Sequence, residues 1–429
     1  MRRHTPSLES LEDRRLLTTV GGSIVTDTAW TLEESPYEVT SDVTVRENAT
    51  LVIEPGVVIH FDEGTDLEIE GHLIAEGTPQ QRITFDRAPG EPRWDGLKFE
   101  NSLADNRVSY ADMRYGDGQG EAIDVDESRL LLDNITWTGT RGTILELDHP
   151  SLIVRNSHFP TSNGGEVIHG EKISGDEYLI IENNLFENSN NGGDVIDFLG
   201  AERPGPVLQI LNNVFMGGGD DGLDLDGTDA HIEGNLFMNF RKNTGRNTTS
   251  NAIATGLPQN GDDNRTEVTI VRNVFVNNDH GILLKEDAFA TIQNNVFFGS
   301  NRAVIQFNEV GGTAVKGAGK GAAIRGNIFA ENDQLFKNLI DTAGFTTQLT
   351  IDDSWLPNEV VEFGDNNINA HDLGEGNLSG DPLFVDPASI DFRLRPESPA
   401  RGQGPMNLDM GAYVEARPVI VEAIGDDDI

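Results

Sequence analysis

The sequence contains no cysteine, which excludes disulfide bonds, thiolate metal sites and cysteine nucleophiles. It also lacks any run of 18 apolar residues, so we expect no membrane-spanning helix and no insertion into a membrane. Basic residues are scarce, with 31 Lys and Arg against 72 Asp and Glu, and the formal net charge is −41. A surface of this charge repels phosphate backbones, so nucleic acid is not an expected partner.

Glycine and short apolar stretches are what the sequence has instead. Gly accounts for 47 of the 429 residues, and hydrophobic residues make up only 37%. This composition is typical of many short strands joined by tight turns. A chain of this length exceeds the usual size of one compact core, so two domains would be the ordinary expectation. A solenoid removes that limit, because each added coil buries its apolar face on the preceding coil.

An Asn-apolar-Phe unit recurs through the middle of the chain. Successive units are between 22 and 38 residues apart, and 22 is both the shortest and the most frequent spacing. A fixed minimum with a variable excess is typical of a β-solenoid whose turns carry insertions of different lengths. Six clear units begin at Asn184, Asn213, Asn235, Asn273, Asn295 and Asn327, and two weaker ones begin at Asn134 and Asn156.

Each unit also contains a second apolar strand after a turn rich in Gly, Asn and Asp. Equivalent residues of parallel coils stack about 4.8 Å apart. The Phe residues should therefore form one inward column, and the Asn residues a ladder in which each amide bonds the next coil. We interpret the Asn residues as structural, with ligand binding as the alternative. A second inward column should contain Ile168, Ile196, Leu223, Ile253, Ile282 and Val304.

These patterns predict an all-β protein, a single-stranded right-handed parallel β-helix over residues 20–415. Residues 43–85 alternate apolar and polar positions and resemble the opening coils of bacterial β-helix proteins, and residues 380–413 resemble their C-terminal edge. Residues 1–19 are interpreted as an export arm and residues 416–429 as an acidic tail or linker. We expect a monomer.

The N-terminal segment is basic and lacks the apolar stretch of an ordinary signal peptide. Residues 7–17, SLESLEDRRLL, resemble the N-terminal motif of planctomycete extracellular proteins. That resemblance implies export and an extracellular or cell-surface location, without implying an activity.

An aspartate-rich patch lies in two successive coils, GGDVID at residues 192–197 and GGGDDGLDLDG at residues 217–227. Aligning the columns places Asp194 beside Asp221 and Asp197 beside Asp224. Like charges this close are costly without a counter-ion, and a hard divalent cation with oxygen ligands is the simplest remedy. We therefore expect a calcium site; the alternative is that these residues cap turns and lie apart in solvent. The candidate ligands are Asp194, Asp197, Asp220, Asp221 and Asp224.

This patch resembles the calcium site of parallel β-helix pectate lyases, especially those of the ninth polysaccharide-lyase family. Asp220, Asp221 and Asp224 match the family's Asp-Asp-x-x-Asp run, and Asp194 or Asp197 matches its upstream ligand. The resemblance implies an acidic polysaccharide as substrate. It also implies that calcium acidifies the proton beside a uronate carboxylate and that Lys or Arg removes it in a β-elimination. The sequence departs from the family where its lysine is expected, because Ala254 stands there.

Other basic residues are candidates to replace that lysine, although the chain has only seven lysines. Lys285 falls in the outward column of Asp226, two coils further on, or about 10 Å away. Lys242 and Arg241 lie in an insertion that could fold over the patch. For each of them the alternative is a solvated surface charge. His169, His280 and Asp226 are candidate substrate contacts.

Two classes of function remain open at this point. One is a calcium-dependent enzyme that cleaves an acidic polysaccharide by elimination. The other is a non-catalytic cell-surface or structural β-helix that binds glycans, with calcium as a brace. A third interpretation, from the loose resemblance of Asp220-Asp221 and His280-Gly281 to β-helix polygalacturonases, is weaker because a whole coil separates the two pairs.

Overall fold

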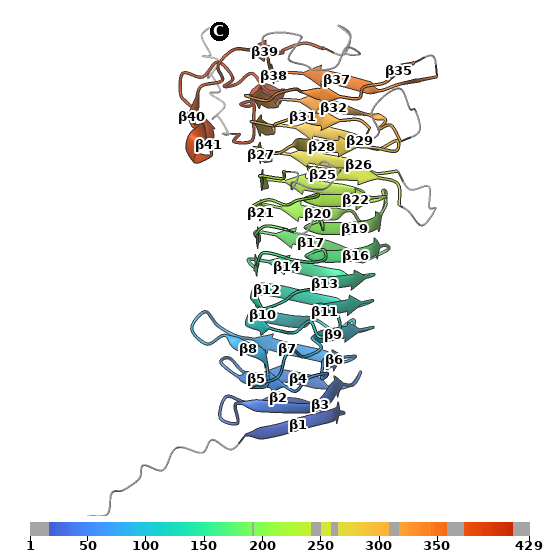
Figure 1. Ribbon diagram of the computed structural model, residues 1–429, viewed down its shortest axis with the longest axis vertical. Helices are drawn as coiled ribbons and strands as arrows, with labels where there is room; N and C mark the ends of the chain where they lie inside the picture. The colour runs from blue at the N-terminus through green and yellow to red at the C-terminus, as the bar shows by residue number, and fades with distance from the viewer. Residues whose placement is uncertain are drawn as a thin grey trace, which may run out of the picture.

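The chain winds into one column of stacked coils in the computed structural model (Figure 1). The structure describes residues 17–190, 193–241, 250–258, 265–308, 317–342, 344–357 and 373–414. It is an all-β parallel solenoid of about 12 turns, as predicted. No helix among the described residues has the length and apolar character needed to cross a bilayer. Residues 1–16 of the predicted N-terminal arm lie outside the described residues.

Each coil contributes a strand to each of three parallel stacks, and adjacent coils pair in register. The first stack carries the aspartate-rich patch on its outer surface. Its strands are β6 (Leu67–Ile69), β9 (Leu97–Glu100), β11 (Glu121–Asp126), β13 (Thr143–Asp148), β16 (Ile168–Ile173), β19 (Ile196–Ala201), β22 (Leu223–Asp226), β25 (Asn251–Gly256), β28 (His280–Leu284), β31 (Ala303–Gln306) and β34 (Phe336–Lys337).

The second stack follows the first in each coil. It comprises β2 (Thr28–Trp30), β4 (Thr50–Ile53), β7 (His72–Glu76), β10 (Asn106–Arg114), β12 (Arg129–Thr138), β14 (Ser151–Arg155), β17 (Tyr178–Glu182), β20 (Leu208–Leu211), β23 (Ala230–Glu233), β26 (Glu267–Val271), β29 (Phe289–Gln293), β32 (Gly321–Arg325) and β37 (Gln348–Asp352).

The third stack contains the Phe column. The long strands β10 and β12 continue into it from the second stack, and its other strands are β5 (Val58–Phe61), β8 (Ile83–Arg87), β15 (His158–Phe159), β18 (Leu185–Phe186), β21 (Val214–Phe215), β24 (Leu236–Met238), β27 (Val274–Val276), β30 (Val296–Phe298), β33 (Ile328–Ala330), β38 (Trp355–Leu356) and β39 (Leu378–Ser379). At the N-terminal end, β1 (Thr18–Ile24) pairs along β3 (Tyr37–Val45), which in turn pairs with both β5 and β6.

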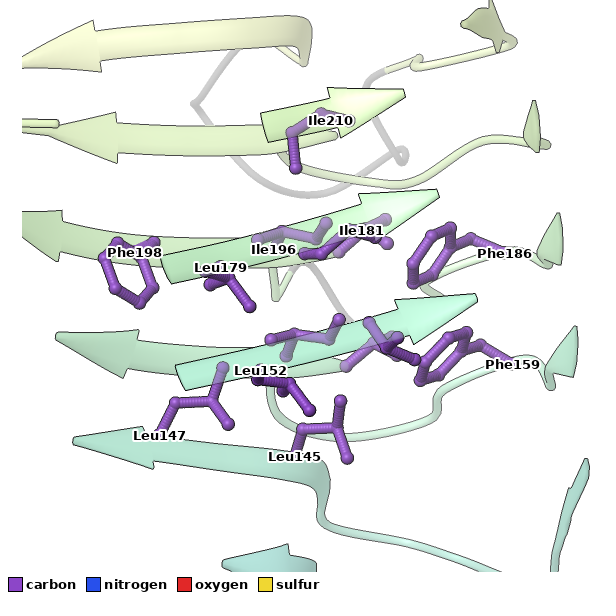
Figure 2. Close-up of a cluster of buried hydrophobic side chains, with 14 of the residues drawn as sticks. Leu145, Leu147, Leu152, Phe159, Leu179, Ile181, Phe186, Ile196, Phe198 and Ile210 are labelled. Carbon is purple, nitrogen blue, oxygen red and sulfur yellow. The ribbon is translucent and has the colours of Figure 1, made fainter. Parts of the chain in front are cut away.

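The core is a continuous apolar filling between the three stacks. Figure 2 shows Phe159 and Phe186 one above the other, with Leu145 and Leu147 of β13 pointing toward the same interior. The ring centroids of Phe186 and Phe215 are 4.7 Å apart, as are those of Phe215 and Phe237, and the rings are nearly parallel. The predicted Phe column is therefore confirmed.

Replacing Phe215 by Leu should lower the free energy of unfolding by about 1–2 kcal/mol, because Leu keeps most of the buried area but loses both stacking contacts. Urea unfolding followed by circular dichroism measures the change. The control is Tyr178→Leu, since the Tyr178 side chain is only half-buried, at the start of β17. An equal loss of unfolding free energy in the control would show that ring stacking does not add to the stability of the protein.

The predicted Asn ladder is also confirmed. The Asn273 side chain accepts hydrogen bonds from the backbone N–H and Nδ2 of Asn235, at 2.8 and 2.9 Å. Its own Nδ2 donates to the carbonyl oxygen of Ile232 and to Oδ1 of Asn295. The same pattern joins Asn184, Asn213, Asn235, Asn273, Asn295 and Asn327.

Two details of the predicted register are wrong by one residue. Ser157, not Asn156, is the ladder member below Asn184, because the Ser157 N–H donates to Asn184 Oδ1 at 2.9 Å. Asn134 and Asn156 occupy the preceding position, where φ is 60° and 53°, and Asn is among the few residues that tolerate this left-handed conformation.

The inward apolar column of the first stack continues from Ile282 to Ile305, not to Val304, because Ile305 pairs with Ile282. Val304 precedes Ile305 within the same strand, β31, and is buried as well. Each correction moves the register by one residue, because the turn that precedes a strand can gain or lose a residue.

The C-terminal segment packs against the side of the column instead of adding a coil (Figure 1). It contains the antiparallel strands β40 (Phe384–Asp386) and β41 (Asp391–Leu394) with the short 3-10 turns η3 (Pro387–Ser389) and η4 (Pro405–Asn407). Phe384 and Phe392 bury their rings against Phe298 of β30. A second small hairpin, β35 (Asp341–Thr342) and β36 (Phe345–Thr346), projects from a late coil.

Candidate metal centre

The aspartate-rich patch forms two neighbouring columns on the outer surface of the first stack. Asp197 of β19 and Asp224 of β22 are partners in register. Asp194 and Asp221 occupy the turns just before these strands, and the Asp221 N–H donates to Asp194 Oδ1 at 2.9 Å. Both predicted alignments are therefore confirmed. Residues 27 positions apart in the chain meet because one coil separates them.

Hydrogen bonds along the turn column hold the buried carboxylates in place. Asp221 Oδ1 accepts the backbone N–H of Asn251 at 2.9 Å and the Asn251 Nδ2 at 2.7 Å. Asp194 uses its own Oδ1 for the Asp221 N–H. In both aspartates these bonds use only Oδ1, so Oδ2 is not needed for the turn structure.

Carboxylate oxygens converge in two groups that share Asp194. One group is Asp194, Asp220 and Asp221, and the other is Glu166, Asp194 and Asp197; within each, one oxygen per residue lies within 4.8 Å of the others. A calcium–oxygen distance of about 2.3–2.6 Å requires ligand oxygens no more than about 5 Å apart. Both groups therefore have the spacing that a divalent cation needs.

Glu166 is a member that the sequence analysis missed. It stands one coil before Asp194, and the backbone N–H of Val167 donates to the carbonyl oxygen of Val195. The two segments Glu166-Val167-Ile168 and Asp194-Val195-Ile196 have the same pattern. Extending the same column by one coil would have found it.

Burial and mutual repulsion make these carboxylates hard to ionise together. Burial, followed by the charge of Asp224, raises the pKa of Asp194 to about 8. The same two causes raise the pKa of Asp197 to about 6 and that of Asp226 to about 7. Burial and the Asp194 charge raise the pKa of Asp221 well above its ordinary value. A bound cation would replace the protons, because it favours the charged carboxylates.

The stability of the cation-free protein should fall as the pH rises from about 4 to 8. Between the ordinary value of 3.8 and the raised pKa values, the folded state binds more protons at these aspartates than the unfolded state does. Stability falls with pH wherever the folded state holds the excess protons. Chemical unfolding in calcium-free buffer at both ends of the range measures this. A rise in stability across the range would contradict the pKa shifts of the cluster.

Lys285 lies at the edge of the patch, as its predicted column requires. Its Nζ is 3.6 Å from Asp226 Oδ1, although one coil separates the two residues. The intervening residue is Gly256, where an added Cβ would lie 2.4 Å from Asp226 Oδ1 and 2.6 Å from Lys285 Cε. The missing side chain therefore lets Lys285 reach across a whole coil and act as the counter-ion of Asp226.

His169 is a second cation within the acidic column. It lies in register between Glu146 and Asp197, and its Nδ1 is 2.6 Å from Glu146 Oε1. That hydrogen bond raises the pKa of His169 to about 9, so the ring is charged at neutral pH. Further back in the same column, burial and the Glu121 charge raise the pKa of Asp124 to about 6.

The other predicted site residues lie elsewhere. Ala254, which stands where a base was expected, has no exposed surface, and Leu283 below it is 2% exposed. Arg241 donates to the carbonyl oxygen of Asn277 and to Asn301 Oδ1, which ties it to the turns of later coils. His280 follows Asn251 in the turn column and is fully buried. Lys242 lies outside the described residues.

No protein-family model matches the chain. A segment of 81 residues, 19% of the chain, is 43% identical to part of Protein bark beetle from Drosophila melanogaster. That match spans only 2% of the Drosophila protein.

The solved structures that resemble the chain include several polysaccharide lyases. The PL6 family alginate lyase AlyGC has a TM-score of 0.46 and 14% identity, over 87% of this chain and 57% of the lyase, so the chain spans little more than half of it. Pectate lyase Pel9A has a TM-score of 0.32 and 12% identity, over 86% of this chain and 88% of the lyase. The PL6 family polysaccharide lyase Pedsa3628 from Pseudopedobacter saltans has a TM-score of 0.37 and 14% identity, over 90% of this chain and 99% of the lyase. At these identities the likeness concerns the fold alone.

Proposed function

We propose that this chain is a calcium-binding β-solenoid that binds an acidic polysaccharide through the bound ion. The observation that carries the proposal is the convergence of carboxylate oxygens from Asp194, Asp220 and Asp221, with Glu166 and Asp197 beside them. Carboxylate oxygens are the ligands that calcium prefers, and it takes six to eight of them. Three or four protein carboxylates therefore leave coordination positions for a ligand.

The charge of the surface explains why an ion is needed for such a ligand. The first stack presents Asp124, Glu146, Asp197 and Asp224 in one outward column, in which His169 is the one cation between Asp124 and Asp224, so this stretch is negative overall and would repel a uronate polymer. Asp194 and Asp220 are half-buried, so an ion bound between them would still face solvent. A calcium ion there can be shared between protein and sugar carboxylates. Because such shared sites are weak, an extracellular or cell-surface location, where calcium is abundant, suits the proposal.

Calcium-assisted elimination is the second candidate function, and one observation favours it. Lys285 places an ammonium group on the same outer surface, at 3.6 Å from Asp226, and Asp197 lies within its electrostatic range. Its engagement with Asp226 opposes a role as general base. The burial of Ala254 opposes contact between substrate and that position. The geometry therefore supports binding better than cleavage.

Binding to immobilised polygalacturonate tests the proposed function. The wild-type protein should be retained with calcium and released by chelator, and Asp194→Asn should abolish retention because Asp194 belongs to both oxygen groups. The matched control is Asp126→Asn, which removes one charge from the same stack two coils before Glu166. Retention that ignores calcium, or that survives Asp194→Asn, would refute the proposal.

Incubating the same polymer in solution with protein and calcium separates the two candidate functions. An increase in the ultraviolet absorbance of unsaturated uronates would show elimination. If it occurs, Lys285→Ala should abolish it while leaving retention on the matrix intact. We expect retention without an increase.

A further inference from the structure

The N-terminal end of the column leaves one edge of a strand open. β1 is the last strand at this end (Figure 1), and within the described part of the chain it pairs only with β3. The backbone groups along its other edge are therefore available to a further strand. An open edge of this kind is a template for pairing with another chain, and proteins usually protect it with charged side chains, Pro or a covering segment.

The sequence around this edge lacks charge and proline. Residues 17–26, LTTVGGSIVT, contain neither, although 24% of the chain is charged and its formal net charge is −41. Leu17 and Val25, which flank β1, are 58% and 66% exposed. The end of the column is therefore an uncharged, partly apolar strip on a strongly acidic protein.

The apolar core is also incomplete at this end. Val20 and Ile24 pair with Val39 and Val45 of β3. Val39 and Val45 have no exposed surface, because another coil follows them. Val20 and Ile24 pack against the same core but are only partly buried. A further strand placed against β1 would complete their burial.

The backbone of β1 is suited to pairing with a second copy of itself. The Thr18 N–H and the Ile24 carbonyl oxygen form their hydrogen bonds on the β3 side. Alternate residues of a strand direct their backbone groups to opposite edges, so those of Thr19, Gly21 and Ser23 face the open edge. An antiparallel copy related by a two-fold axis at Gly21 places Thr19 opposite Ser23, and Gly21 opposite itself, with these groups facing one another.

The shape and the side chains of β1 agree with the same axis. Thr18–Val20 pairs along the third stack and Gly22–Ile24 along the first, so the strand bends at Gly21 and the axis passes through the bend. Residues that face the interior then lie opposite one another, and so do residues that face outward. The resulting pairs are Thr18 with Ile24, Val20 with Gly22, Thr19 with Ser23 and Leu17 with Val25, all uncharged.

We propose that two copies of this chain associate end to end, through antiparallel pairing of their β1 strands about a two-fold axis at Gly21. A second copy suits this edge because one axis satisfies the backbone, the bend and the side chains together. The pairing uses the same surface on both copies, so the assembly closes as a dimer and leaves neither β1 edge open. This dimer would replace the monomer expected from the sequence. It is independent of the proposed function, because the acidic patch lies on β19 and β22, several coils away.

Disulfide cross-linking tests the register, because the natural chain contains no cysteine. Paired residues of this kind have Cα atoms about 5.5 Å apart, a distance that a disulfide can span. An oxidised mixture of Thr19→Cys and Ser23→Cys should therefore give a covalent dimer with one chain of each. Either variant alone should cross-link only at the background level, because its two cysteines would be roughly 10–13 Å apart. Asn188→Cys, exposed on another coil, measures that background.

Sedimentation velocity measures the association itself. Thr19→Pro removes an N–H that faces the open edge, a position where an edge strand tolerates Pro, so the circular dichroism spectrum should stay that of the wild type. Dimerisation should weaken at least about 10-fold, because the lost hydrogen bond occurs twice in the dimer. The matched control Thr19→Val keeps the N–H and should dimerise like the wild type. Added sodium chloride should strengthen the wild-type dimer, because it screens the repulsion between two acidic chains.

Three results would overturn the dimer. One is a wild-type protein that sediments as a monomer at every concentration and salt level. Another is a mixture of the two cysteine variants that cross-links no better than Asn188→Cys, a result that does not depend on the fold of the Pro variant. The third is equal dimerisation of Thr19→Pro and Thr19→Val, which would show that the copies meet at another surface.

Discussion

Asp221→Asn is expected to stabilise the calcium-free protein near pH 8 and, at the same time, to abolish stabilisation by calcium. Asn is the same size as Asp and keeps Oδ1 as acceptor for the Asn251 N–H. It removes a carboxyl group whose charged form is disfavoured by burial and by the charge of Asp194, which together raise the pKa of Asp221 well above its ordinary value. The wild-type protein should instead gain about 2.7 kcal/mol when calcium is 100-fold above its dissociation constant.

Thermal unfolding with calcium and with chelator measures both effects in one experiment. Asp126→Asn, which removes a charge outside the two oxygen groups, should respond to calcium like the wild type. An Asp221→Asn protein that is less stable than the wild type in chelator, yet still responds to calcium, would mean that Asp221 is a turn residue with no part in ion binding.

Asn273→Ala should destabilise the protein by about 3–5 kcal/mol. The substitution removes the acceptor for the N–H and Nδ2 of Asn235 and leaves the carbonyl oxygen of Ile232 without its donor. All of these groups are buried, so water cannot replace the lost bonds.

Urea unfolding gives the magnitude, and hydrogen exchange should show faster opening of the coils next to Asn273, because each coil contacts only its neighbours. The exposed Asn188, whose Nδ2 donates to Oδ1 of the exposed Asn190, provides the control, and Asn188→Ala should change stability by less than about 0.5 kcal/mol. A loss spread evenly over the whole column, or no larger than that of the control, would contradict the ladder's role.

The repeat made much of the fold predictable. Stacking requires the same residue type at the same place in every coil, so the Asn and Phe columns are visible in the spacing of Asn213, Asn235 and Asn273. It also made the alignment of Asp197 with Asp224 predictable, because both stand at fixed offsets from the buried Ile196 and Leu223. Stacking in register converts a sequence pattern directly into spatial contact.

Two features could not be predicted from the sequence: the conformation of the turns, and which outward-facing side chains are buried by other segments of the chain. The shift between Asn156 and Ser157 depends on which residue adopts the left-handed turn conformation, and both residue types suit a turn. The burial of Ala254 and Leu283 depends on what covers the outer surface, which no periodicity reveals. The reach of Lys285 to Asp226 depends on the missing side chain at Gly256, whose effect appears only when three coils are stacked.

A crystal structure grown with calcium would test the central claim most directly, because anomalous scattering locates the ion. We predict a peak within about 2.6 Å of oxygens from Asp194, Asp220 and Asp221, absent from crystals of Asp194→Asn. Carboxyl groups at those positions that instead share protons, with no peak between them at saturating calcium, would contradict the account.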